Sequence, residues 1–98
     1  MSTRIGYVCS VGIARCEVAP NRRIAIPIVP GIFKHLACED LPGILQNPVA
    51  ARKYTVEALR VAPWQVLREF DRRWLTECLD RADLTAGRRA ALEFMLRL

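Results

Sequence analysis

The sequence predicts an α+β fold in which an N-terminal antiparallel β-hairpin packs on a C-terminal bundle of two to three helices. Three observations lead to this prediction: apolar residues alternate in the first part, prolines and glycines crowd the middle, and apolar residues recur at helical spacing thereafter. We expect a single domain over residues 1–98. The hairpin occupies 1–30, a Pro/Gly-rich connection with a short helix occupies 31–47, and the helical part occupies 48–98.

The hairpin is predicted from two runs in which every second side chain is apolar. In the first run, residues 5–18, the apolar side chains expected on one face are Ile5, Tyr7, Cys9, Val11 and Ile13. In the second run, residues 22–29, they are Ile24, Ile26 and Ile28. Pro20-Asn21 between the runs is favourable turn chemistry, and Pro27 lacks a backbone donor, which places its strand at a sheet edge.

The connection carries Pro-Gly pairs at 30–31 and 42–43, each of which favours a turn. Only one or two short turns of helix fit there, and we expect them at residues 32–38. His35 and Cys38 lie three residues apart in this segment, so they are a candidate Cys-His nucleophile.

A helix from residue 48 to about residue 60 is predicted because Asn47 is a favourable cap and Pro48 suits the first helical position. Its apolar residues lie on two opposite sides: Val49, Val56 and Leu59 on one, and Tyr54, Ala58 and Val61 on the other. The β-prone run Tyr-Thr-Val within it leaves a strand as the alternative for this segment.

The clearest helical pattern covers residues 63–82, where we expect one continuous core helix. Leu67, Phe70, Trp74 and Cys78 share one face of it. Asp71 projects into this apolar arc, and burying an unpaired carboxylate is expensive. Asp71 therefore pairs with an Arg, contacts a partner, or lies at an exposed edge of the arc.

A last helix is expected after Asp83 or Thr85, both of which can cap it. Apolar residues cover about two-thirds of its circumference, more than the neighbours of a terminal helix commonly bury. Either the helix lies in a groove between the hairpin and the long helix, or one face, with Phe94 and Leu98, meets another molecule.

Composition supports a binding role. The chain is 52% hydrophobic, whereas a chain of this length buries only about 60–65% of the surface that unfolding exposes. The surplus of apolar side chains is typical of a partner surface or a self-association face. The net charge of +5 permits a nucleic-acid partner without requiring one, and the preference for Arg over Lys is either functional or compositional.

We therefore expect a small non-catalytic module that docks on a partner protein as a regulator or inhibitor, or that self-associates through the apolar C-terminal helix. Small phage-encoded inhibitors of host enzymes are one such class, by analogy of size and type alone. The candidate partner-binding residues are Trp64, Gln65, Arg68, Asp71, Arg72, Phe94 and Leu98.

A DNA-binding regulator is the alternative. The run L-x-V-A-P-W-Q-V, from Leu59 to Val66, resembles the turn of a helix-turn-helix motif, with Pro63 opening the recognition helix. The residues that this resemblance directs to nucleic acid are Trp64, Gln65, Arg68 and Arg72. The residues that depart from the motif are Val56, Arg60 and Glu69.

A metal or catalytic site is the third hypothesis. Thiolates and imidazole suit zinc, and the candidate ligands are Cys9, Cys16, His35 and Cys38. The spacing lacks a C-x-x-C pair, so buried thiols are the alternative. His35 is the only histidine and no Gly-rich phosphate loop is present, so we expect neither an enzyme nor a cofactor.

The longest apolar runs are too short to cross a bilayer. Arg15 stands before Cys16, where signal cleavage requires a small residue. We expect a cytoplasmic protein without membrane contact.

Overall fold

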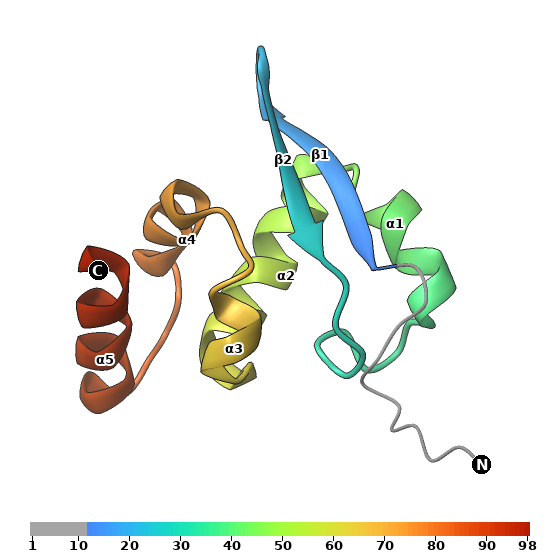
Figure 1. Ribbon diagram of the computed structural model, residues 1–98. Helices are drawn as coiled ribbons and strands as arrows, with labels where there is room; N and C mark the ends of the chain where they lie inside the picture. Colours follow the sequence, from blue (N-terminus) through green and yellow to red (C-terminus); the bar gives the residue numbers. More distant parts are fainter. Residues whose placement is uncertain (1–11) are drawn as a thin grey trace.

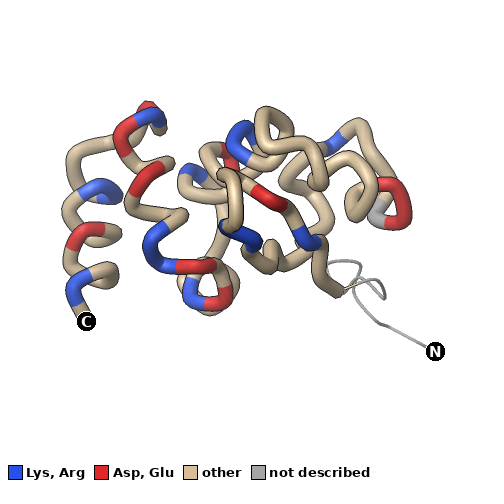
Figure 2. Tube along the Cα trace, turned by 90° about the horizontal axis from the view of Figure 1, so that it is seen from above, with Lys and Arg blue, Asp and Glu red and all other residues tan. Residues whose placement is uncertain are grey.

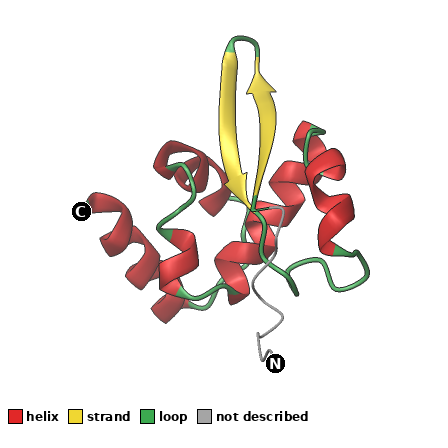
Figure 3. Cartoon of the chain, turned by 45° about the vertical axis from the view of Figure 1, so that its right-hand side comes forward, coloured by secondary structure: helices red, strands yellow, loops and turns green. Residues whose placement is uncertain are grey.

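An antiparallel β-hairpin followed by helices forms the protein in the computed structural model, which describes residues 12–98 apart from the side chain of Cys38 (Figure 1). This architecture confirms the predicted α+β class. The hairpin stands on the helices with its turn farthest from them, while α1 and α5 lie at opposite ends of the molecule (Figures 1 and 3). The elements are β1 (Ile13–Ala19), β2 (Arg22–Pro27), a 3-10 helix (Cys38–Asp40), α1 (Leu41–Ile44), α2 (Pro48–Val61), α3 (Trp64–Leu67), α4 (Arg72–Leu79) and α5 (Ala86–Arg97).

The hairpin turn is at Pro20-Asn21, as predicted. Asn21 has a φ of 61°, a left-handed conformation that Asn tolerates better than most residues. Its backbone N–H donates to Oε2 of Glu17 at 3.3 Å. An irregularity between Glu17 and Ala19 precedes the turn, and regular pairing then runs from Glu17 opposite Arg23 to Ile13 opposite Pro27.

The inner face of the hairpin combines small residues of β1 with isoleucines of β2. Ala14 lies opposite Ile26, Cys16 lies opposite Ile24, and all four side chains are buried. The sequence placed Ile13 on this face, which is wrong, because Ile13 is 52% exposed. In the observed register the buried residues of β1, Ala14 and Cys16, are small and lie opposite large isoleucines of β2. The rest of the predicted apolar face, from Ile5 to Val11, lies outside the described residues.

The short helix expected at residues 32–38 is wrong, because residues 32–36 form turns and bends and only the last residue of the range, Cys38, belongs to a helix, the 3-10 helix. Helical structure begins later, with the 3-10 helix that leads directly into α1. Pro42 lies in the first turn of α1, where its missing N–H costs no hydrogen bond. Leu41 and Leu45 anchor this segment in the core, at 1% and 0% exposure.

The helix predicted over 48–60 is confirmed as α2, which excludes the strand alternative. The Asn47 side chain accepts hydrogen bonds from Val49 N and Ala50 N at 2.8 and 3.4 Å. Its core face follows helical spacing, and the residues on it are Ala51, Tyr54, Thr55, Ala58 and Leu59. The sequence offered no single apolar face because alanine and a buried threonine make up most of this one.

One continuous helix over 63–82 is wrong: the chain forms α3, a turn, and then α4. Asp71 causes the restart, because its Oδ1 accepts a hydrogen bond from Trp74 N at 2.9 Å and so caps α4. The predicted stripe is nevertheless buried. Its members Leu67, Phe70, Trp74 and Cys78 are at most 3% exposed.

The last helix is confirmed as α5, and Thr85 caps it by accepting from Arg88 N at 3.2 Å. Two arginines attach it to the other helices. The Arg88 side chain donates to Leu59 O at 2.6 Å and to Ala62 O at 2.7 Å, at the C-terminal end of α2. Arg89 Nη2 donates to Leu79 O at 3.3 Å and to Ala82 O at 3.1 Å, beyond the end of α4.

Candidate functional site: an apolar groove

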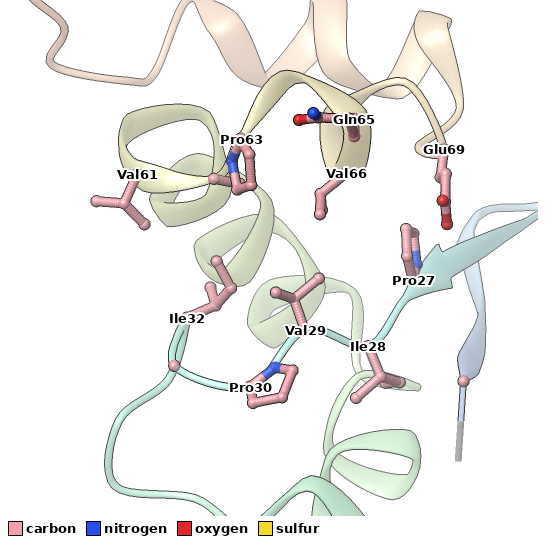
Figure 4. Close-up of a pocket in the computed structure, with 13 residues that line it drawn as sticks. Pro27, Ile28, Val29, Pro30, Ile32, Val61, Pro63, Gln65, Val66 and Glu69 are labelled. Carbon is pink, nitrogen blue, oxygen red and sulfur yellow. The ribbon is translucent and has the colours of Figure 1, made fainter. Parts of the chain in front are cut away.

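An apolar groove of about 890 Å³ lies between the chain that follows β2 and the α2–α3 junction (Figure 4). Ile28, Ile32 and Ala62 form its base and are at most 7% exposed. Val61 stands at its edge, 56% exposed, and Val66 faces it from α3. Aliphatic side chains thus form most of a concave surface that is open to a ligand.

Two polar side chains lie on one side of the groove. Gln65 belongs to α3 and Glu69 to the turn that follows it. Figure 4 shows Val66 and Glu69 directed toward the chain that follows β2. Among the described residues that line the groove, Glu69 is the only ionisable one. The arrangement can bind apolar groups while a single carboxylate at its rim attracts a cation or a hydrogen-bond donor.

The strand-side wall is held in place by Tyr54. Its hydroxyl donates to Pro27 O and accepts from Val29 N, both at 2.8 Å. Ile28 N donates to Gly12 O at 2.8 Å, which extends the hairpin pairing beyond β1. Burial raises the pKa of Tyr54 to about 12, although the hydrogen bond from Val29 opposes this increase in part. The wall is therefore fixed by buried hydrogen bonds.

The helical wall is held by Arg88. Besides its hydrogen bonds to the end of α2, the Arg88 guanidinium lies over the Trp64 ring, 4.7 Å from its centre. Burial lowers the pKa of Arg88 from its ordinary value. Trp64 is 37% exposed, and the Arg88 cation already covers one face of its ring.

The predicted partner-binding residues are not brought together at one site. Gln65 lines the groove, whereas Arg68 and Arg72 are exposed and are not among its lining residues. Phe94 on α5 and Leu98 directly after it are 64% and 70% exposed. These two apolar side chains thus face away from the core, and whether a partner covers them stays a prediction.

Asp71 lies beside an arginine, which is one of the three arrangements that the sequence left open for its carboxylate. It caps α4 and also lies 3.8 Å from Nη2 of Arg22. Arg22 Nη1 donates to both carboxylate oxygens of Glu77, at 3.0 and 2.8 Å, and so connects the hairpin to α4. Buried Nη2 of Arg22 makes no hydrogen bond to any described group.

The broken helix changes the helix-turn-helix hypothesis. The segment expected to be the recognition helix contains α3, which has four residues, and then a turn. Arg68 ends α3 and Arg72 begins α4, so they do not project from one helix as the resemblance implied. Lys and Arg are also interspersed with Asp and Glu along the chain (Figure 2).

The proposed zinc ligands are only partly described. Cys16 is a buried free thiol whose Sγ donates to Gln46 O at 3.4 Å, while His35 is exposed. Cys9 and the Cys38 side chain lie outside the described residues. Within the part of the chain that the structure describes, no three potential ligands cluster. Burial raises the pKa of Cys16 and raises that of Cys78 to about 11, which favours the protonated thiols.

The sequence did not identify the groove. The available signal was the run Ile-Pro-Ile-Val-Pro-Gly-Ile, residues 26–32, because an apolar run interrupted by two prolines cannot continue as a paired strand. No neighbouring strand pairs with such a run, so its apolar side chains are only partly covered by the elements beside it. Its opposite wall, Val61 and Val66, belongs to a segment more than 30 residues later and is brought there by folding.

None of the helices in residues 12–98 has the length and apolar character needed to cross a membrane. Comparisons with protein families, with curated proteins and with solved structures found no match to this chain.

Proposed function

We propose that this protein is a non-catalytic module that binds a partner protein, as a small regulator or inhibitor does, and that the apolar groove receives part of that partner. The observation that carries the proposal is the groove itself: an open aliphatic surface with one carboxylate at its rim. Its occupant is an apolar segment of the partner that also carries a Lys or Arg.

The lining chemistry supports this choice of occupant. Burial of a ligand's aliphatic side chains against the apolar base stabilises the complex by about 25 cal/mol per Å² of surface removed from water. Glu69 has no salt bridge to a described residue and is exposed at the rim. It is therefore available to a cation of the ligand. Walls already fixed by Tyr54 and Arg88 need little further ordering, which favours binding.

Selection of short random peptides displayed on phage, against the full chain, tests the proposal. We expect enriched peptides that combine aliphatic residues with Lys or Arg. Val61→Asn should weaken their binding about fivefold, because it replaces one aliphatic contact worth roughly 1 kcal/mol. Glu69→Lys should shift the selection toward peptides with Asp or Glu in place of the cation.

Val49→Asn is the matched control, because Val49 is a valine on the same helix, 65% exposed and outside the lining of this groove. It should leave the affinity for these peptides unchanged. Equal weakening by Val49→Asn and Val61→Asn, or amide chemical-shift changes confined to residues away from the groove, would refute the assignment.

A further inference from the structure

A second groove lies on the other side of α2, between that helix and the loop that follows β2. Its volume, about 1150 Å³, exceeds that of the apolar groove. Lys34, Arg52, Lys53 and Arg81 line it, and among the described residues one carboxylate, that of Glu57, lies with them. We call it the basic groove.

The carboxylate in the basic groove is already partly neutralised. Glu57 Oε1 lies 3.4 Å from Nη1 of Arg60, one helical turn further along α2. None of the four cations in the groove has a salt bridge among the described residues. Arg52 is held by its position over the Trp74 ring, 5.0 Å from the centre. The groove thus presents an excess of positive charge, part of it fixed in place.

Aliphatic side chains lie between these charges. Val49 and Val56 are seven residues apart on the same face of α2, about 10 Å along its axis, and Leu36 faces them from the loop. Val49 is 65% exposed and Leu36 is 38% exposed. Val49 and Val56 therefore lie outside the buried face of α2, to which Tyr54 and Ala58 belong, and they border the groove instead.

We propose that the basic groove binds an acidic amphipathic helix of a partner protein. The cations attract Asp and Glu on its flanks, and the aliphatic residues receive an apolar stripe with the same seven-residue spacing. The site is distinct from the apolar groove and does not depend on the proposed occupant of that groove.

Single-stranded nucleic acid fits these observations less well. Nucleic-acid grooves stack successive bases on open aromatic faces, whereas the described lining of this groove offers one exposed ring, the imidazole of His35, and its Phe33 is half-buried. Phe33 packs edge-on against Tyr54, with ring centres 5.4 Å apart and planes at 83°. The exposed Val49 and Leu36 instead offer apolar contacts that a phosphate backbone does not use.

The test begins with a peptide selection against the full chain at low salt. We expect a class of enriched peptides with net negative charge and aliphatic residues at helical spacing. The probe for binding measurements is the best of these peptides, labelled with fluorescein. Its affinity should fall as salt rises from about 50 to about 200 mM, because exposed charges are screened.

Variants then locate the site. Lys53→Glu should weaken binding of the acidic probe about tenfold, since it replaces an attraction by a repulsion. Arg97→Glu makes the same charge change on an exposed residue outside the groove and should have little effect. Val49→Asn should weaken binding of this probe. Val61 lines the other groove, so Val61→Asn should leave the binding of this probe unchanged. Lys34→Glu, on the loop, provides a second variant should Lys53→Glu impair folding.

Three outcomes would overturn the proposal: no enrichment of acidic peptides, equal weakening by Lys53→Glu and Arg97→Glu, or a Val49→Asn variant with unchanged affinity. A labelled single-stranded oligonucleotide is measured in parallel. If it binds more tightly than the acidic probe and responds to Lys53→Glu, the groove is a nucleic-acid site and the proposal is wrong.

Discussion

Thr55 is the polar residue of the described core, and two hydrogen bonds explain its burial. It is 0% exposed. Its hydroxyl donates to Ala51 O at 2.8 Å and accepts from Nε1 of Trp74 at 2.7 Å. The indole N–H of a fully buried tryptophan needs a partner, since an unpaired buried donor costs about 1–3 kcal/mol. Thr55 supplies that partner and thereby joins α2 to α4.

Thr55→Val should lower the free energy of unfolding by about 1–3 kcal/mol, because it keeps the shape and removes the acceptor for Trp74. Urea denaturation measures this change. Thr76→Val is the matched control: its hydroxyl makes the same backward bond, to Arg72 O at 2.9 Å, but is exposed. The control should cost less than about 0.5 kcal/mol. Equal losses would contradict the role given to Thr55.

The preference for Arg over Lys has a structural component. Arg22 binds both oxygens of Glu77, Arg52 lies over Trp74, and Arg88 and Arg89 each reach two backbone carbonyls. A planar guanidinium makes such paired contacts, whereas an ammonium group does not. Composition alone left the origin of this preference open, and the contacts assign at least these four arginines to the fold.

At the scale of elements, the sequence predicted helix starts better than helix continuity. The sequence predicts a cap at Asn47 and another at Asp83 or Thr85, and Asn47 and Thr85 accept a backbone hydrogen bond at the start of a helix. Apolar spacing makes Asp71 a misfit in a stripe, although Asp is an equally good cap residue and caps α4. Apolar spacing did not reveal the break, because the turn between α3 and α4 returns Phe70 and Trp74 to the same core.

The grooves were not predictable from local patterns, although the sequence identifies some of the apolar residues that line them. Periodicity describes one element at a time, whereas each groove combines the loop after β2 with residues of α2, and α1 lies between these segments in the sequence. Helical spacing places Val49 and Val61 on opposite sides of the predicted helix. Only the fold shows that each borders a different groove.

The attachment of α5 can be tested through Arg88. Arg88→Lys keeps the charge but removes the paired hydrogen bonds to Leu59 O and Ala62 O, and should cost about 1–2 kcal/mol in the free energy of unfolding. Thermal and urea denaturation measure the loss. Arg97→Lys, at the exposed end of the same helix, is the control and should change stability by less than about 0.5 kcal/mol. The assignment fails if the two variants are equally stable.

At the scale of the whole molecule, Tyr54 makes the free energy of unfolding fall as the pH becomes alkaline. Its pKa is raised by burial from an ordinary value of 10.0 to about 12 in the folded protein. A raised pKa means that the folded state holds the proton more tightly. The stabilisation is therefore complete below pH 10 and is lost as the pH rises from 10 to about 12. Two pKa units correspond to about 2–3 kcal/mol.

Tyr54→Phe isolates this contribution. The variant is less stable at neutral pH, because Val29 N–H and Pro27 O lose their partner. The difference in unfolding free energy between the two proteins should narrow between pH 10 and 12, as wild-type Tyr54 loses its advantage. Cys78, with a pKa raised to about 11, affects both proteins alike. A difference that stays constant with pH would show that Tyr54 does not ionise in this range.

Ile32 lines both grooves. Its side chain is 7% exposed, so Ile32→Ala would remove part of the wall of both grooves at once. The loop after β2 thus uses one buried isoleucine to build two surfaces of different character, one mainly aliphatic and the other rich in cations.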